Sequence, residues 1–94
     1  MFDRIVSKLM KDYSYSVYSA EVTATDLLTV KDARVASAVA HWLNNNTHPI
    51  VTIDGYSTSS LSRDYGMTYP AALVFLNWIT IDPVTARNSL AFRM

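Results

Sequence analysis

Hydrophobic residues at the start of the chain recur at helical spacing. The stripe follows an i, i+3, i+4, i+7, i+8 pattern and consists of Phe2, Ile5, Val6, Leu9 and Met10. Charged residues of both signs lie on the opposite side, which is typical of a helix packed against a core or a dimer seam rather than a membrane anchor. The pattern predicts a helix of about three turns at the N-terminus.

Residues 13–19 alternate aromatic or branched residues with serine, which favours an extended strand or arm. Residues 20–28 give no clear pattern. Tyr13, Tyr15 and Tyr18 are residues of the type that stacks on unpaired bases, but such platforms usually carry interleaved basic residues, and here serines stand between them. A packed strand or a dimer-forming arm is therefore the better interpretation.

The middle of the chain predicts a helix followed by a short strand. Thr29 and Asp32 resemble a capping box, and residues 44–46, all asparagine, end the helix that follows. Residues 49–53 form a branched, apolar run that predicts a strand, closed by the turn pair Asp54 and Gly55. The apolar stripe of the helix contains Val35, Ala36, Val39, Ala40, Trp42 and Leu43.

Residues 56–81 predict two helices joined by a tight corner. Gly66 ends the first helix by adopting the left-handed conformation, and the apolar Met67 fills the corner. Thr68 caps the second helix, and Pro70 lies in its first turn, where a missing N–H has no effect. These signals indicate a helix-turn-helix.

The end of the chain predicts a hairpin. Residues 80–82 and 89–93 have the composition of two short strands, and residues 85–88 form the turn between them. Pro83 suits a strand end or an edge position.

Composition narrows the class of protein. The 94 residues allow one modest core, and 50% hydrophobic with 17% charged residues indicates a folded chain. The net charge of zero argues against a protein that coats nucleic acid or an anionic membrane. The absence of cysteine excludes disulfides and thiolate chemistry, and no long apolar run or basic leader is present. We expect a soluble, intracellular, cytoplasmic protein without membrane contact.

From residue 29 onward the expected order is helix, strand, helix, helix, strand, strand, and this order resembles the winged helix-turn-helix superfamily. The resemblance rests on the helix around Leu61, the Gly66-Met67-Thr68 corner, the helix with Ala72 and Phe75, and the terminal hairpin as the wing. It implies an α+β winged helix-turn-helix domain over residues 29–94. Residues 1–28 precede it as an N-terminal helix and arm, which we expect to form a homodimer.

The resemblance also implies a site for double-stranded DNA. The second motif helix then enters the major groove with Thr68, Tyr69, Leu73 and Asn77 outward. Four residues pack inward in this arrangement: Met67, Ala72, Phe75 and Ile79. Residues expected at phosphates or at the wing tip are Ser57, Thr58, Arg63, Arg87 and Asn88. The implied function is that of a small transcriptional regulator.

The second motif helix departs from the family pattern. Residues 69–79 contain no lysine or arginine, and the helix is apolar nearly all round. A helix of this kind is usually buried or covered by a partner. The alternative to DNA binding is therefore an adaptor that binds another protein through this helix.

Catalytic patterns are weak throughout the sequence. His41 and His48 lack the i, i+4 spacing of a helical metal pair, and the serines lie in no nucleophile motif. The two glycines form no phosphate loop, and the aspartates are explained as cap and turn residues. We expect no enzyme activity, no cofactor and no metal site.

Overall fold

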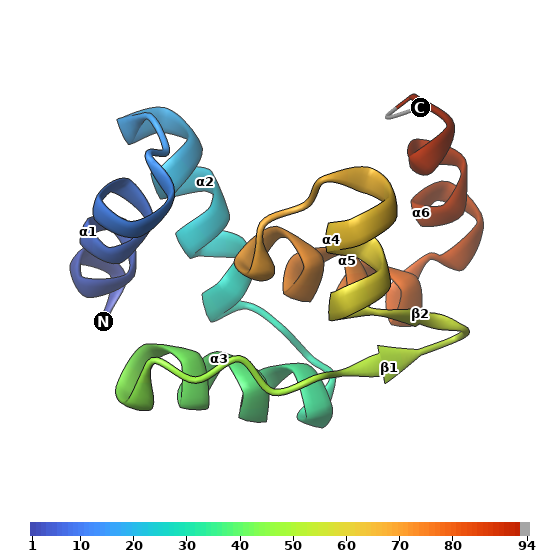
Figure 1. The fold of residues 1–94 in the computed structure, drawn as a ribbon, viewed down its shortest axis with the longest axis horizontal. Coiled ribbons are helices and arrows are strands. Elements are labelled where there is room, and N and C mark those ends of the chain that lie inside the picture. The colour runs from blue at the N-terminus through green and yellow to red at the C-terminus, as the bar shows by residue number, and fades with distance from the viewer. Residues whose placement is uncertain (93–94) are drawn as a thin grey trace.

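The computed structural model describes residues 1–92, which form a mostly helical α+β domain with one small antiparallel sheet (Figure 1). Figure 1 shows α1 and α2 at one end of the longest axis and α6 at the other. The elements are α1 (Phe2–Tyr13), α2 (Val17–Leu28), α3 (Ala33–Asn45), β1 (Thr52–Ile53), β2 (Tyr56–Ser57), α4 (Thr58–Tyr65), α5 (Tyr69–Ile81), α6 (Pro83–Ser89) and the 3-10 turn η1 (Leu90–Phe92). None of the described helices combines the length and apolar character that a membrane span requires.

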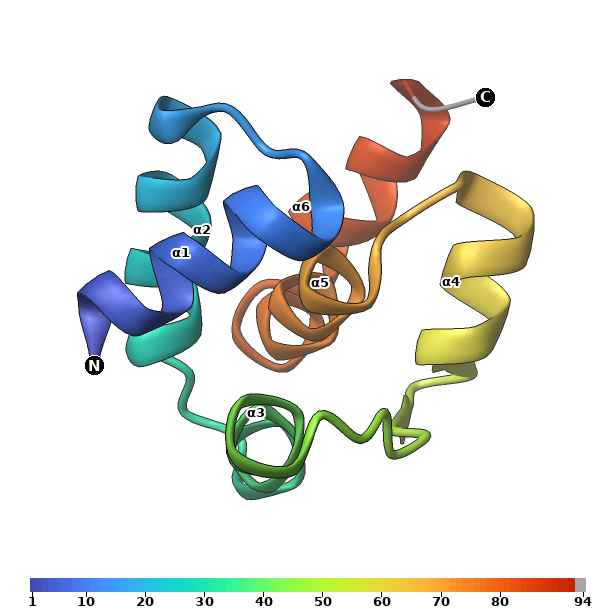
Figure 2. The ribbon, with the colours of Figure 1, turned by 60° about the vertical axis from the view of Figure 1, so that its left-hand side comes forward.

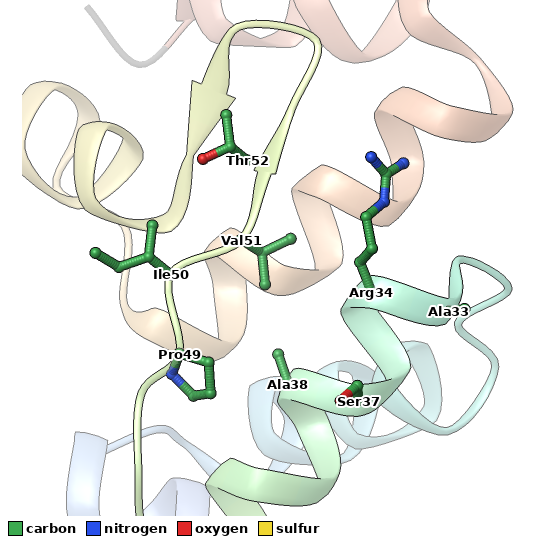
Figure 3. Close-up of a pocket in the computed structure, with 8 residues that line it drawn as sticks. All are labelled: Ala33, Arg34, Ser37, Ala38, Pro49, Ile50, Val51 and Thr52. Atoms are coloured by element: carbon green, nitrogen blue, oxygen red, sulfur yellow. The ribbon is translucent and has the colours of Figure 1, made fainter.

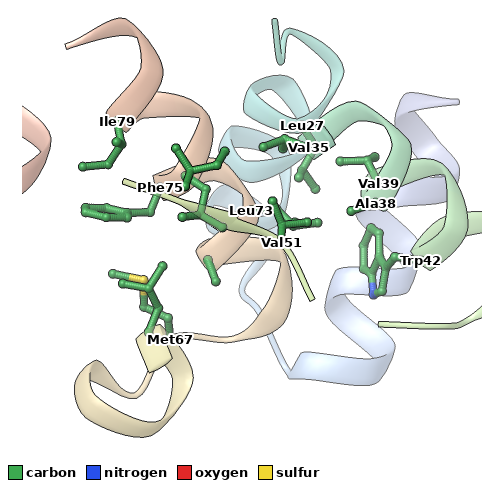
Figure 4. Packing of buried hydrophobic residues seen from close by; sticks show 14 of the residues in the cluster. Leu27, Val35, Ala38, Val39, Trp42, Val51, Met67, Leu73, Phe75 and Ile79 are labelled. Atoms are coloured by element: carbon green, nitrogen blue, oxygen red, sulfur yellow. The ribbon is translucent and has the colours of Figure 1, made fainter. Parts of the chain in front are cut away.

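Helix α5 is the centre of the fold. Figure 2 looks along α5 and shows the other helices around it, and α5 contacts α2, α3, α4, α6 and both strands. The helix carries no charged residue, so it is buried without unpaired charge. Its buried residues are Pro70, Ala72, Leu73, Phe75, Leu76, Asn77 and Ile79. Figure 4 shows Leu73 and Phe75 beside core residues of other elements, including Val35 and Val51.

The first 28 residues form a helical hairpin, so the predicted extended arm is wrong. Ser14 ends α1 in the left-handed conformation, and the Ser16 hydroxyl accepts the N–H of Ser19 to cap α2. Ser14 and Ser16, which suggested strand alternation, are therefore cap residues, a role that their short polar side chains favour. Ile5 and Leu9 of the N-terminal stripe are fully buried in the same cluster as the α5 residues.

Helix α3 and the hairpin after it follow the sequence with two changes. Asp32, rather than Thr29, caps α3, because its carboxylate accepts the N–H groups of Arg34 and Val35. Asn46 ends α3 in the left-handed conformation, as predicted. The strand is shorter than predicted, and its turn residues Asp54 and Gly55 both have positive φ, which suits a two-residue hairpin.

The corner between α4 and α5 confirms the prediction. Gly66 has φ 67° and its N–H bonds the carbonyls of the last turn of α4. Met67 is buried, and the Thr68 hydroxyl accepts the N–H of Ala71 to begin α5. Pro70 lies in the first turn, where its missing N–H leaves no bond unmade.

The predicted C-terminal hairpin is wrong within the described residues. Helix α5 continues to Ile81, and Asp82 then caps α6 by accepting the N–H of Thr85. Pro83 takes the first position of α6, and Ala86 and Leu90 are buried, which is helical rather than strand spacing. The last predicted strand also included Arg93, which lies outside the described residues. The strand pair of this fold thus precedes α4 and does not follow α5.

Candidate functional site

Ser57 and Thr58 hold local structure instead of facing a ligand. Ser57 caps α4 in a capping box with Ser60, with both hydrogen bonds at 3.0 Å. Thr58 is buried, and its Oγ1 accepts the N–H of Val51 at 3.3 Å. The expected phosphate contact from Thr58 is wrong, because its hydroxyl is used inside the protein.

Thr68 and Tyr69 are half-buried at the start of α5. The Thr68 hydroxyl is hydrogen-bonded to the hydroxyl of Tyr15, which joins the corner to the α1–α2 turn. The Tyr69 hydroxyl donates to the carbonyl of Pro49 at 2.7 Å, and its ring meets His48 edge-on at 4.9 Å. Burial raises the pKa of Tyr69 to about 12. Both side chains are engaged with neighbouring segments of the chain.

Leu73 and Asn77 point inward, so the predicted outward face of α5 is wrong. Leu73 is fully buried. Asn77 Oδ1 accepts the N–H groups of Lys31 at 2.9 Å and Asp32 at 3.1 Å, and thereby fixes the segment before α3. A uniformly apolar helix gives no periodicity from which to read its orientation. The inward positions of Met67, Ala72, Phe75 and Ile79 are confirmed.

The cations expected at phosphates are exposed and paired with carboxylates. Arg63 binds Asp64 through Nε at 2.9 Å, and this guanidinium lowers the pKa of Asp64. Arg87 pairs with Asp54 at the hairpin turn. Asn88 is exposed on α6 instead of at a wing tip. Of the predicted residues, Thr58 and Tyr69 line one small pocket of about 240 Å³, while Asn77 lines a different one.

One strip of α5 does reach the surface, beside α2. Val74 and Trp78 are half-buried, and Ile81 is 61% exposed. Together with Asp26 and Thr29 of the α2 end they line a groove of about 430 Å³, which we call the α2–α5 groove. Asn77 also lines this groove, and Val84, 66% exposed, follows shortly after Ile81 at the start of α6.

Asp26 gives the α2–α5 groove its electrostatic character. Within residues 1–92 its carboxylate takes part in no ion pair or hydrogen bond. Asp26 is an exposed residue, and the loss of part of its solvation at the groove raises the pKa of its carboxyl. The groove thus combines an apolar wall with an uncompensated acid. The sequence did not point to Asp26, because residues 20–28 gave no clear pattern. It did indicate that a partner or the core covers α5, because that helix is apolar nearly all round.

Comparisons of the chain with protein families, with curated proteins and with solved structures found no match.

Proposed function

We propose that this protein is an intracellular adaptor that binds another protein, without catalysis, through the α2–α5 groove. The observation that carries the proposal is the exposed strip of α5, Val74, Trp78 and Ile81, next to the unpaired Asp26. The partner element is an amphipathic helix with an apolar stripe and a lysine or arginine at its edge.

The chemistry of the groove supports this partner. An amphipathic helix lays apolar side chains at i, i+3, i+4 and i+7 into a groove of this kind. Tryptophan is enriched among the residues that contribute most to binding at interfaces, and Trp78 forms part of the wall. A cation at the edge of the partner would pair with the Asp26 carboxylate, which has no ion-pair partner within residues 1–92.

The α4–α5 corner, on which the winged-helix resemblance partly rests, is present in the structure. The function that competes with protein binding is therefore the recognition of duplex DNA. A reading helix must insert exposed side chains into the major groove. The burial of Leu73 and Asn77, together with the pairing of Arg63 and Arg87, favours the protein-binding function. The homodimer expected through residues 1–28 stays a prediction, and its available surface is the outer side of α2 with Tyr18 and Val22.

Selection from a displayed library of amphipathic helices tests the proposal. The full chain is the bait, and Ile81→Asp is compared with Ile50→Asp, the same change at an exposed isoleucine outside the α2–α5 groove. We expect the selected helices to carry lysine or arginine. Their affinity should fall about tenfold or more for Ile81→Asp, about 1.4 kcal/mol, and stay unchanged for Ile50→Asp.

Two further measurements separate the rival functions. Asp26→Asn should weaken the selected cationic helices, because it removes the charge that they pair with. Titration with a 20-base-pair duplex, about two helical turns, at low salt should give no binding, whereas binding that falls steeply with salt would support the DNA function. Helices that bind wild type and Ile81→Asp equally would contradict the adaptor proposal.

A further inference from the structure

A second groove lies on another part of the surface, between α3 and the segment that leads into β1. Its volume is about 440 Å³. Figure 3 shows Arg34 and Ser37 on the α3 side and Val51 of the strand side pointing toward α3, while the side chains of Ile50 and Thr52 point away from α3. Ala38 and Val51 are buried at its base. We call it the α3–β1 groove.

The strand side of the α3–β1 groove is a free sheet edge. Thr52 pairs with Ser57, and one residue earlier the Thr58 N–H donates to the Val51 carbonyl at 3.1 Å. Backbone groups of successive residues in a strand point to opposite sides, so the N–H and C=O groups of Ile50 and Thr52 point away from β2. Within residues 1–92 no hydrogen bond joins them to α3.

Such an edge selects an extended backbone as its partner. Unpaired N–H and C=O groups along a strand are a template for another strand, and they cannot be satisfied by a helix, whose own backbone groups are already paired. Ser37 and Ala33 have small side chains, so the α3 side of the groove leaves room for the side chains of the added segment.

The α3–β1 groove carries one cation, which is already paired with an acid. Arg34 is the charged residue of the wall, and its side chain is 60% exposed, while that of its partner Asp32 is only 13% exposed. Arg34 binds the Asp32 carboxylate through Nε at 3.1 Å and Nη2 at 2.8 Å, and within residues 1–92 its Nη1 makes no hydrogen bond. The Asp32 carboxylate also caps α3 and so offsets the partial positive charge of that helix end. A carboxylate on the partner can accept a hydrogen bond from the exposed Nη1 of Arg34.

We propose that the α3–β1 groove binds an extended, carboxylate-bearing peptide segment of a partner protein, which adds a strand to the free edge of β1. The carboxylate pairs with Arg34, and the backbone of the segment bonds to Ile50 and Thr52. This site is separate from the α2–α5 groove and does not depend on the function proposed for it.

Selection of displayed random octapeptides against the full chain tests this proposal. Thr52→Pro removes the outward N–H without removing a bond of the β1–β2 ladder, and Ser37→Phe fills the groove from an exposed position of α3. We expect peptides rich in alternating apolar residues with aspartate or glutamate. Their affinity should fall about tenfold or more in each variant, and for Arg34→Gln by a similar factor. Bound peptide should protect the Thr52 amide from hydrogen exchange.

The controls keep the outcomes distinct. Ile81→Asp, in the α2–α5 groove, should leave octapeptide binding unchanged whether or not the adaptor proposal holds. If Thr52→Pro fails to fold by circular dichroism, Ser37→Phe decides. The proposal is overturned if no peptides are enriched, if they bind Ser37→Phe as tightly as wild type, or if the Thr52 amide stays unprotected.

Discussion

The two sides of α5 are built from similar residues but have opposite surroundings. Leu73 and Leu76 are fully buried beneath the surrounding helices, whereas Ile81 is 61% exposed and Trp78 is half-buried beside α2. Both sides are apolar. Position in the fold, and not residue type, therefore decides which part of the helix stabilises the domain and which part is available to a partner.

The burial of most of α5 changes the role expected for the second helix of the helix-turn-helix, which was to enter the major groove of DNA. The corner forms as the sequence predicts, with Gly66 and Thr68 in their cap roles. The helix after the corner nevertheless serves as the core of the domain, because most of its residues are buried beneath the surrounding elements. A local motif thus defines a turn and leaves open which surface the next helix presents.

The largest expected effect is on the buried side. Leu73→Ala should lower the free energy of unfolding by about 2 to 5 kcal/mol, because it leaves a cavity in the core. Ile81→Ala should change it by less than about 0.5 kcal/mol, since this side chain is mostly exposed. Chemical denaturation of both variants measures the two losses in the free energy of unfolding. Equal losses would contradict the difference between the buried and the exposed side of α5.

Asn77 tests the polar part of the buried side. Asn77→Ala should cost about 1 to 3 kcal/mol, because the N–H groups of Lys31 and Asp32 lose their acceptor. Ile81→Ala, at an exposed position of the same helix, serves as the control and should cost far less. A neutral Asn77→Ala would mean that the segment before α3 is held by other contacts.

Tyr69 is half-buried at the start of α5, and the pH dependence of stability tests its environment. Its pKa is raised from 10.0 to about 12, so the folded state favours the neutral phenol. The stability that this contributes is complete below pH 10 and should be lost as the pH rises toward 12. Tyr69→Phe should cost about 0.5 to 1.5 kcal/mol at neutral pH through the lost bond to Pro49. It should also flatten the alkaline decline in thermal stability, and an unchanged decline would contradict the assignment.

The smallest effect is expected at the exposed pair of α4. Arg63→Ala should leave the unfolding midpoint unchanged, because exposed ion pairs contribute little. It should raise the pKa of Asp64 toward its ordinary value, since the guanidinium is what lowers it. Carbon-detected NMR titration of the carboxyl measures this shift. An unchanged pKa would mean that the pair does not persist in solution.

The sequence predicts those elements whose ends carry strong local signals. Gly66, Asn46 and the Asp54-Gly55 turn lie where expected because their left-handed conformations depend on local chemistry. The apolar stripe of α1 is also predictable, since one face alone is buried.

The segments that were mispredicted have weak or ambiguous local signals. In residues 13–19 the serines fit strand alternation and helix caps equally well, and the contacts of Tyr15 with Thr68 are made across the chain. Residues 80–92 have strand-like composition, but packing of Ala86 and Leu90 onto the core selects a helix. The α2–α5 groove depends on how two helices meet, which no single segment encodes.

Native-state hydrogen exchange of α5 tests the central claim, that this helix is the core of the domain. The amides of Leu73, Leu76 and Asn77 should exchange only through global unfolding, with an opening free energy equal to that from denaturation. Exchange of these amides through local opening, at a free energy well below the global value, would contradict the claim.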